Sequence, residues 1–150
     1  MNSANNNMPL IQGAETARPI ALPPLITNPH YQMAGGEQGI QKLVNRFYEL
    51  MDELPHAREI RAMHPADLSH ARERLFMFLS GWLGGPPLYE ERFGHPRLRQ
   101  KHISFPIGEA ERDAWMLCMT LALDEVIEEP ELRTQLTQSF FKTADFLRNL

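Results

Sequence analysis

The sequence predicts an all-α fold. From residue 35 onward, apolar residues recur at spacings of three and four, which is the period of a helix with one buried face. No segment alternates apolar and polar residues between turn signals, as the strands of a hairpin would. Glycine and proline pairs separate the periodic segments, so the chain divides into several helices rather than one long one.

The first 30 residues differ from the rest of the chain. They hold five prolines, a run of three asparagines and little periodicity, which is typical of a flexible tail. An oligomerising segment or a lid is the alternative. We therefore expect a flexible N-terminal extension over residues 1–30 and a folded domain over residues 31–150, because 150 residues suit one domain.

Two long helices are expected in the first half of the domain. One starts after Gly35 and Gly36 and ends before Pro55, with an apolar stripe formed by Ile40, Val44, Phe47, Tyr48 and Met51. The other is expected to begin at Pro65, because proline suits the first helical position, and to run to Leu83. Its apolar face carries Leu68, Ala71, Leu75, Phe78, Leu79 and Trp82.

The second half predicts a short helix around His102, which ends at Phe105-Pro106, followed by two longer helices. The first of these spans residues 108–128 and places Trp115, Cys118, Met119, Ala122 and Val126 along one stripe. The last follows Pro130, with Leu132, Leu136, Phe140 and Leu147 as its apolar positions.

Charge and composition exclude several classes of protein. The net charge of -4 and the scattered basic residues argue against a nucleic-acid partner. No apolar run of about 18 residues is present to span a membrane, and the first residues lack the features of a signal peptide. Cys118 is the single cysteine, which excludes an intrachain disulfide and favours a reducing compartment. We therefore expect a cytoplasmic protein.

His102 is the candidate metal ligand. A neutral imidazole is the commonest metal ligand in proteins, and a single histidine holds haem iron in several classes of haem protein. Two cations within one turn, Arg99 and Lys101, are suited to the haem propionates. Apolar side chains that can cover the haem body are Leu98, Ile103 and Phe105. The alternative is a structural histidine whose ring nitrogens are satisfied by the protein.

Seven short motifs then occur in one order along the chain. They are Arg46-Phe47-Tyr48, His64-Pro65-Ala66-Asp67-Leu68, Arg74-Leu75-Phe76-Met77-Phe78-Leu79, Trp82-Leu83-Gly84-Gly85-Pro86, Gly94-His95-Pro96, His102 followed by Phe105-Pro106-Ile107, and Glu111-Arg112-Asp113-Ala114-Trp115. Together they resemble the bacterial group II truncated haemoglobins, strongly over about residues 31–130 and more loosely over the last helix. The resemblance implies a 2-on-2 sandwich of two helix pairs that encloses haem b.

The resemblance also assigns roles to individual residues. It implies that His102 is the proximal iron ligand, and that Tyr48 and Trp115 lie on the opposite, distal face, where their O–H and N–H groups stabilise a bound ligand. Ala71 stands where many globins place a distal histidine. By the same resemblance, Leu75, Phe78 and Leu79 line the distal wall, and Arg74 and Lys101 are the propionate partners. Phe105 is expected to cover the haem body from its position beside His102.

Each assignment has a plainer alternative. Tyr48 and Trp115 suit ordinary core packing, and Arg74 and Lys101 suit a solvated surface. His64, close to the ligand by resemblance, can donate to the ligand, bind a distal water or ligate the iron. His70 is an alternative internal ligand or an exposed helical histidine.

Three functions follow from these expectations. The first is reversible binding of dioxygen, nitric oxide or carbon monoxide by a monomer or homodimer, with chemistry or sensing favoured over oxygen transport because a polar pocket releases oxygen slowly. The second is an enzyme for nitric oxide dioxygenation or peroxide turnover, which needs a separate reductase because the chain has no flavin or nicotinamide domain. The third is a helical interaction module without haem.

Overall fold

The computed structural model describes residues 29–150, and every regular element in that range is a helix. The elements are α2 (His30–Met33), α3 (Gly36–Glu53), η2 (Pro55–Ala57), α4 (Arg58–Ala62), α5 (Ser69–Trp82), α6 (Leu88–Phe93), α7 (Leu98–His102), α8 (Glu109–Val126) and α9 (Pro130–Phe146). The all-α prediction is confirmed. The N-terminal extension predicted over residues 1–30 lies almost wholly outside the described residues.

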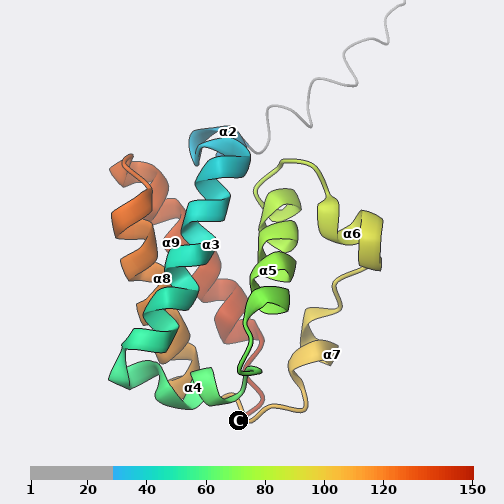
Figure 1. The fold of residues 1–150 in the computed structure, drawn as a ribbon, viewed down its shortest axis with the longest axis vertical. Helices are drawn as coiled ribbons and strands as arrows, with labels where there is room; N and C mark the ends of the chain where they lie inside the picture. Colours follow the sequence, from blue (N-terminus) through green and yellow to red (C-terminus); the bar gives the residue numbers. More distant parts are fainter. Residues whose placement is uncertain (1–28) are drawn as a thin grey trace, which may run out of the picture.

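Four long helices form the body of the molecule (Figure 1). Helix α3 packs against both α5 and α8, and α8 packs against α9. Two helix pairs, α3 with α5 and α8 with α9, therefore face each other. The short helices α6 and α7 lie beside α5, on its side away from α8 (Figure 1).

The core lies between the two pairs and is built from the predicted stripes. All five predicted positions of α3 are buried: Ile40, Val44, Phe47, Tyr48 and Met51. Helices α8 and α9 add Cys118, Met119, Ala122, Leu132, Leu136 and Phe140, all of them buried. Because each large apolar side chain removed from water contributes about 1.5–3 kcal/mol, these stripes hold the four helices together.

Helix α5 begins at Ser69, so the expectation that it begins at Pro65 is wrong. A helix with Pro65 at its first position would use the carbonyls of Pro65 and Ala66 among its earliest acceptors. Both carbonyls instead accept from the Arg61 guanidinium, each at 3.0 Å. The Asp67 carboxylate then accepts from the backbone N–H of Ser69 at 2.9 Å, which satisfies a donor in the first turn of α5.

Helix α7 confirms the short helix expected around His102, and it starts in an unusual conformation. Arg97, the residue before the helix, is the one non-glycine residue in the described range with a positive φ, of 49°. Its backbone N–H donates to the Nδ1 atom of His95 at 3.0 Å, which supports this left-handed turn. The short helices α2, α4 and α6 were not predicted, because four to six residues are too few to show a helical period.

Within residues 29–150, none of the helices combines the length and the apolar character needed to cross a lipid bilayer.

Candidate functional site

His102 stands at the C-terminal end of α7 and is half-buried. Its Nδ1 atom lies 2.7 Å from the backbone carbonyl oxygen of Leu98, one turn earlier. Because a carbonyl oxygen only accepts, Nδ1 carries the proton and the Nε2 atom of the neutral ring keeps its lone pair. The partner that orients the imidazole is therefore the helix backbone itself, which the sequence did not reveal. This is the arrangement that a metal-ligating histidine needs.

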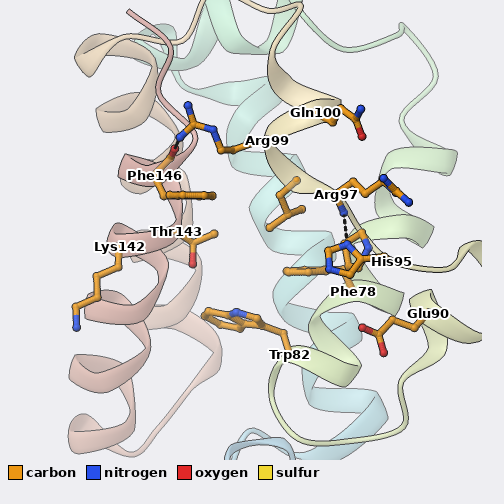
Figure 2. Close-up of a pocket in the computed structure, with 12 residues that line it drawn as sticks. Phe78, Trp82, Glu90, His95, Arg97, Arg99, Gln100, Lys142, Thr143 and Phe146 are labelled. Atoms are coloured by element: carbon orange, nitrogen blue, oxygen red, sulfur yellow. Dashed lines mark hydrogen bonds between the residues drawn. The ribbon is translucent and has the colours of Figure 1, made fainter.

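A cavity of about 770 Å³ opens beside the first turn of α7 (Figure 2). Its walls come from α5, α6, the segment that leads into α7, α7 itself and α9. The lining residues are Phe78, Trp82, Glu90, His95, Pro96, Arg97, Leu98, Arg99, Gln100, Lys142, Thr143 and Phe146. This volume falls within the range of cofactor sites, roughly 300–1,000 Å³.

The cavity brings together only part of the predicted apolar wall. Phe78 lines it, whereas Leu75 and Leu79 pack toward the core, and Phe105 is 38% exposed on the loop after α7. His102 is not itself among the lining residues, although Leu98 on the same short helix is. The roles of Leu75, Leu79 and Phe105 therefore stay predictions.

Several lining residues were missed as site residues by sequence reasoning. Trp82 was expected as part of an apolar helix face and of a family motif but not as a site residue, and Thr143 and Phe146 of α9 were not expected at all. Phe146 falls outside the period set by Leu132, Leu136 and Phe140, so its position carried no signal. Leu98, expected to cover the haem body, does line the cavity.

The basic side chains near this region already have partners. The Lys101 ammonium donates to the Tyr89 hydroxyl at 3.0 Å. Arg99 donates to the carbonyl oxygen of Phe146 at 3.1 Å, and Figure 2 shows it reaching across from α7 to α9. The Arg74 guanidinium lies over the ring of Phe93, 5.2 Å from its centroid. The propionate roles expected of Arg74 and Lys101 stay predictions, and each would require the side chain to share or leave its present partner.

Tyr48 on α3 and Trp115 on α8 both pack against the ring of Phe47. The ring centroid of Phe47 is 4.9 Å from that of Tyr48 and 5.0 Å from that of Trp115. Neither the Tyr48 hydroxyl nor the Trp115 indole N–H donates a hydrogen bond to any residue in the range 29–150. Burial raises the pKa of Tyr48 to about 12, although the positive charge of Arg72 acts to lower it. At neutral pH the phenol is therefore a protonated, unused donor.

His64 completes this cluster. Its ring centroid is 5.9 Å from that of Tyr48, and its Nδ1 atom donates to the carbonyl oxygen of Ile60 at 2.8 Å. A neutral His64 therefore presents an acceptor at Nε2, and donation to a ligand requires the imidazolium form. On α5, Ala71 is half-buried and packs against the core, and His70 is exposed. Tyr48, His64 and Trp115 are the residues we call the distal cluster.

An aromatic chain connects the distal cluster to the cavity. Trp115 packs on Phe140, with ring centroids 5.8 Å apart, and Phe140 packs on Trp82 at 4.6 Å. Trp82 in turn stacks on Phe78 at 6.4 Å, and both line the cavity. The distal cluster and the cavity wall are therefore parts of one continuous aromatic region.

These features fit a haem. The cavity offers apolar walls from α5 and α9 for a flat macrocycle, with the cations Arg97 and Arg99 at its edge. The tautomer of His102 leaves one ring nitrogen available for iron. The distal cluster contains two unused donors, on Tyr48 and Trp115, and their role toward a bound ligand stays a prediction. The residues that would hold the group are His102, Leu98, Phe78 and Trp82.

Comparisons with known proteins identify the family of this chain. Residues 29–149 match the bacterial-like globin family. A group 2 truncated haemoglobin of Bacillus subtilis is 43% identical over 98 residues, which is 65% of this chain and 72% of the relative.

Two solved structures are similar in fold. A group II 2-on-2 haemoglobin from Agrobacterium tumefaciens is 47% identical and has a TM-score of 0.77, covering 79% of this chain and 92% of its own. A truncated haemoglobin from Bacillus subtilis, described as oxygen-avid, is 39% identical and has a TM-score of 0.74, covering 82% of this chain and all of its own.

The resemblance seen in the sequence motifs is therefore confirmed, as is the 2-on-2 arrangement of α3 with α5 and α8 with α9. The cofactor is haem b, and the ligands are diatomic gases. The chain belongs to the group II truncated haemoglobins of the bacterial-like globin family.

Proposed function

We propose that this protein binds dioxygen reversibly and releases it slowly, with His102 as the proximal ligand of the haem iron and the distal cluster as the source of hydrogen bonds. The observation that carries the proposal is the pair of unused donors on Tyr48 and Trp115, whose rings both pack against Phe47. Haem iron supplies the attachment point for a diatomic ligand. The protein supplies the donors that discriminate between ligands.

The distal cluster favours a polar ligand. Tyr48 is buried and Trp115 is half-buried, and neither donor has a protein partner among the described residues, so a ligand that accepts from both forms two hydrogen bonds without displacing a protein partner. Dioxygen at a haem accepts hydrogen bonds well, and carbon monoxide accepts them poorly. One relative with a solved structure is described as oxygen-avid, and a pocket of this kind supports the same property here.

Slow release bears on the purpose of binding. Each donor contributes about 1–3 kcal/mol, which corresponds to roughly tenfold to a hundredfold in affinity. A protein with two such donors would release oxygen slowly and would therefore be a poor oxygen carrier. Sensing or ligand chemistry therefore fits this pocket better than storage or transport. The proposed location is the cytoplasm, where a single buried thiol such as Cys118 stays reduced.

The test is the dissociation rate of oxygen, measured by stopped-flow spectroscopy on the ferrous holoprotein. We expect Tyr48→Phe and Trp115→Phe each to release oxygen roughly tenfold to a hundredfold faster, because each removes one donor. Carbon monoxide release should change much less in the same variants. The matched control is Tyr89→Phe, which removes a hydroxyl that accepts from Lys101, outside the distal cluster.

Equal oxygen release by the wild type and both distal variants would contradict the proposal. The enzyme alternative is examined in the same preparation by adding nitric oxide, NADH and a bacterial flavin reductase. Sustained nitrate formation at many turnovers per haem would favour nitric oxide dioxygenation. A single stoichiometric conversion would favour the binding function.

A further inference from the structure

The segment that follows α9 folds back onto the loop that follows His102. Figure 1 shows the C-terminal end of the chain beside this loop, at the base of the molecule. The backbone N–H of Asn149 donates to the carbonyl oxygen of Ile107 at 2.8 Å, and the N–H of Leu150 donates to the same oxygen at 3.1 Å. Segments about forty residues apart in sequence are thus joined.

The side chain of Asn149 uses both ends of its amide on this loop. Its Oδ1 atom accepts from the backbone N–H of Ile107 at 3.0 Å. Its Nδ2 atom donates to the carbonyl oxygen of Phe105 at 2.8 Å and to that of His102 itself at 3.3 Å. The opposite amide orientation would place an oxygen against two carbonyls, so the network permits only this one.

Helix α7 needs such ties. It has five residues, and none of them is buried, so apolar packing does little to hold it in place. Two contacts from the end of α9 reach it. Arg99 donates to the carbonyl oxygen of Phe146 near the start of α7, and Asn149 donates to the carbonyl oxygen of His102 at its end.

The end of α9 is itself anchored to α8. The Asp145 carboxylate accepts from Arg112 of α8 at 2.8 Å and from Arg148 at 2.8 Å. These hydrogen bonds lower the pKa of Asp145, so it remains ionised well into the acidic range. The segment that carries Asn149 is therefore connected to the main helical body.

We propose that Asn149 is a positioning residue for the proximal histidine. By bonding the carbonyl oxygens of His102 and Phe105, it sets the tilt of α7 and hence the direction in which the His102 imidazole faces the haem. The inference rests on the proposed function, in which His102 is the iron ligand. Asn149 acts through the hydrogen bonds that it makes to the backbone of α7 and of the loop after it.

The test uses the full-length holoprotein in four forms: wild type, Asn149→Ala, Asn149→Asp and Gln138→Ala. Asn149→Asp keeps an oxygen for the Ile107 N–H but places a second oxygen against the two carbonyls, so it removes only the donor side. Gln138 is an exposed amide on α9 and is the matched control. The first readout is the iron–histidine stretching band in the resonance Raman spectrum of the unliganded ferrous protein. The second is the rate of haem transfer to excess apomyoglobin.

We expect the band to shift or broaden in both Asn149 variants, because His102 then samples more than one orientation. Haem transfer should become about three- to tenfold faster, as expected for losing one or two hydrogen bonds. Gln138→Ala should match the wild type in both readouts. A band and a transfer rate unchanged in both Asn149 variants would overturn the inference.

The two proposals fail in different ways. His102→Ala is measured alongside, because the band should disappear in it if His102 is the ligand. If it disappears there while Asn149→Ala and Asn149→Asp remain like the wild type, the proposed function stands and the positioning role is overturned. If the band is absent from the wild type or persists in His102→Ala, the ligand assignment and the positioning role are both overturned.

Discussion

His64 and His102 are oriented by the same kind of hydrogen bond, from the imidazole to a backbone carbonyl oxygen. The Nδ1 atom of His64 donates to the carbonyl oxygen of Ile60, and that of His102 donates to the carbonyl oxygen of Leu98. In both cases the acceptor is four residues earlier in the chain. Each ring is thereby fixed as the tautomer with a free Nε2 lone pair. The free Nε2 atom of His102 suits an iron ligand, and that of His64 suits a hydrogen-bond acceptor beside the Tyr48 ring.

At the level of single residues, Tyr48 makes a prediction about alkaline pH. Its pKa is about 12 because burial disfavours the phenolate, whereas the unfolded chain has an ordinary value near 10. Between these values the unfolded state loses the proton first. The free energy of unfolding that this burial contributes is therefore fully present below about pH 10, and up to about 3 kcal/mol of it is lost as the pH rises through about 12.

Phenolate absorbance measures this directly. The chain has three tyrosines, and one of the three should titrate near pH 12 in the folded protein and be missing from Tyr48→Phe. In urea unfolding, the wild type should lose stability between pH 10 and 12 relative to Tyr48→Phe, because the variant has no phenol at this position. Titration of Tyr48 near pH 10 would contradict the burial of its hydroxyl.

At the level of elements, the boundaries of the long helices other than the start of α5 were largely predictable, whereas among the short helices only α7 was predicted. The α3, α8 and α9 stripes each repeat over several turns, so their periods are visible in the sequence. The start of α5 was missed because it depends on Arg61, a residue of α4, which occupies the carbonyls of Pro65 and Ala66. Such a contact between neighbouring elements leaves no periodic signal.

A second prediction concerns Gly39 of α3, which lies close to the end of α2. A Cβ atom at Gly39 would overlap the backbone carbonyl of Ala34, and a backbone group cannot move aside as a side-chain tip can. We expect Gly39→Ala to lower the free energy of unfolding by about 2–4 kcal/mol, despite the better helix propensity of alanine.

Urea unfolding of the holoprotein provides the measurement, with Gly108→Ala as the control. At Gly108 the added Cβ meets the carboxylate tip of Glu111 at 3.3 Å and Leu150 at 3.6 Å, so we expect a change within about 1 kcal/mol. Equal effects of the two substitutions would show that the α2–α3 contact does not require a glycine.

At the scale of the whole molecule, the site is assembled from helices that are distant in sequence. Motif order pointed to Tyr48, His64, Trp115 and His102 as functional residues, and the structure places the first three in one cluster. The order of the motifs could not show that Phe140 and Trp82 connect this cluster to the cavity. It also could not show that Thr143 and Phe146 of α9 line the cavity. Those contacts depend on how α5, α8 and α9 cross.

The arrangement of the helices leaves two histidines as possible iron ligands. Two histidines lie near the cavity: His95 lines it, and His102 ends the short helix whose first turn lines it. The Nδ1 atom of His95 accepts from the Arg97 N–H, so its ring is used to support the turn before α7. His102 instead has its proton bound to the helix backbone and its Nε2 atom available.

The most direct measurement is therefore the absorption spectrum of the protein titrated with haem, in the ferric, ferrous and carbon monoxide-bound ferrous forms, for wild type, His102→Ala and His95→Ala. We predict saturable one-to-one uptake with a histidine-type carbonyl spectrum in the wild type and in His95→Ala, and loss or alteration of that spectrum in His102→Ala. An unchanged spectrum in His102→Ala, or its loss in His95→Ala, would contradict the assignment of His102 as the proximal ligand.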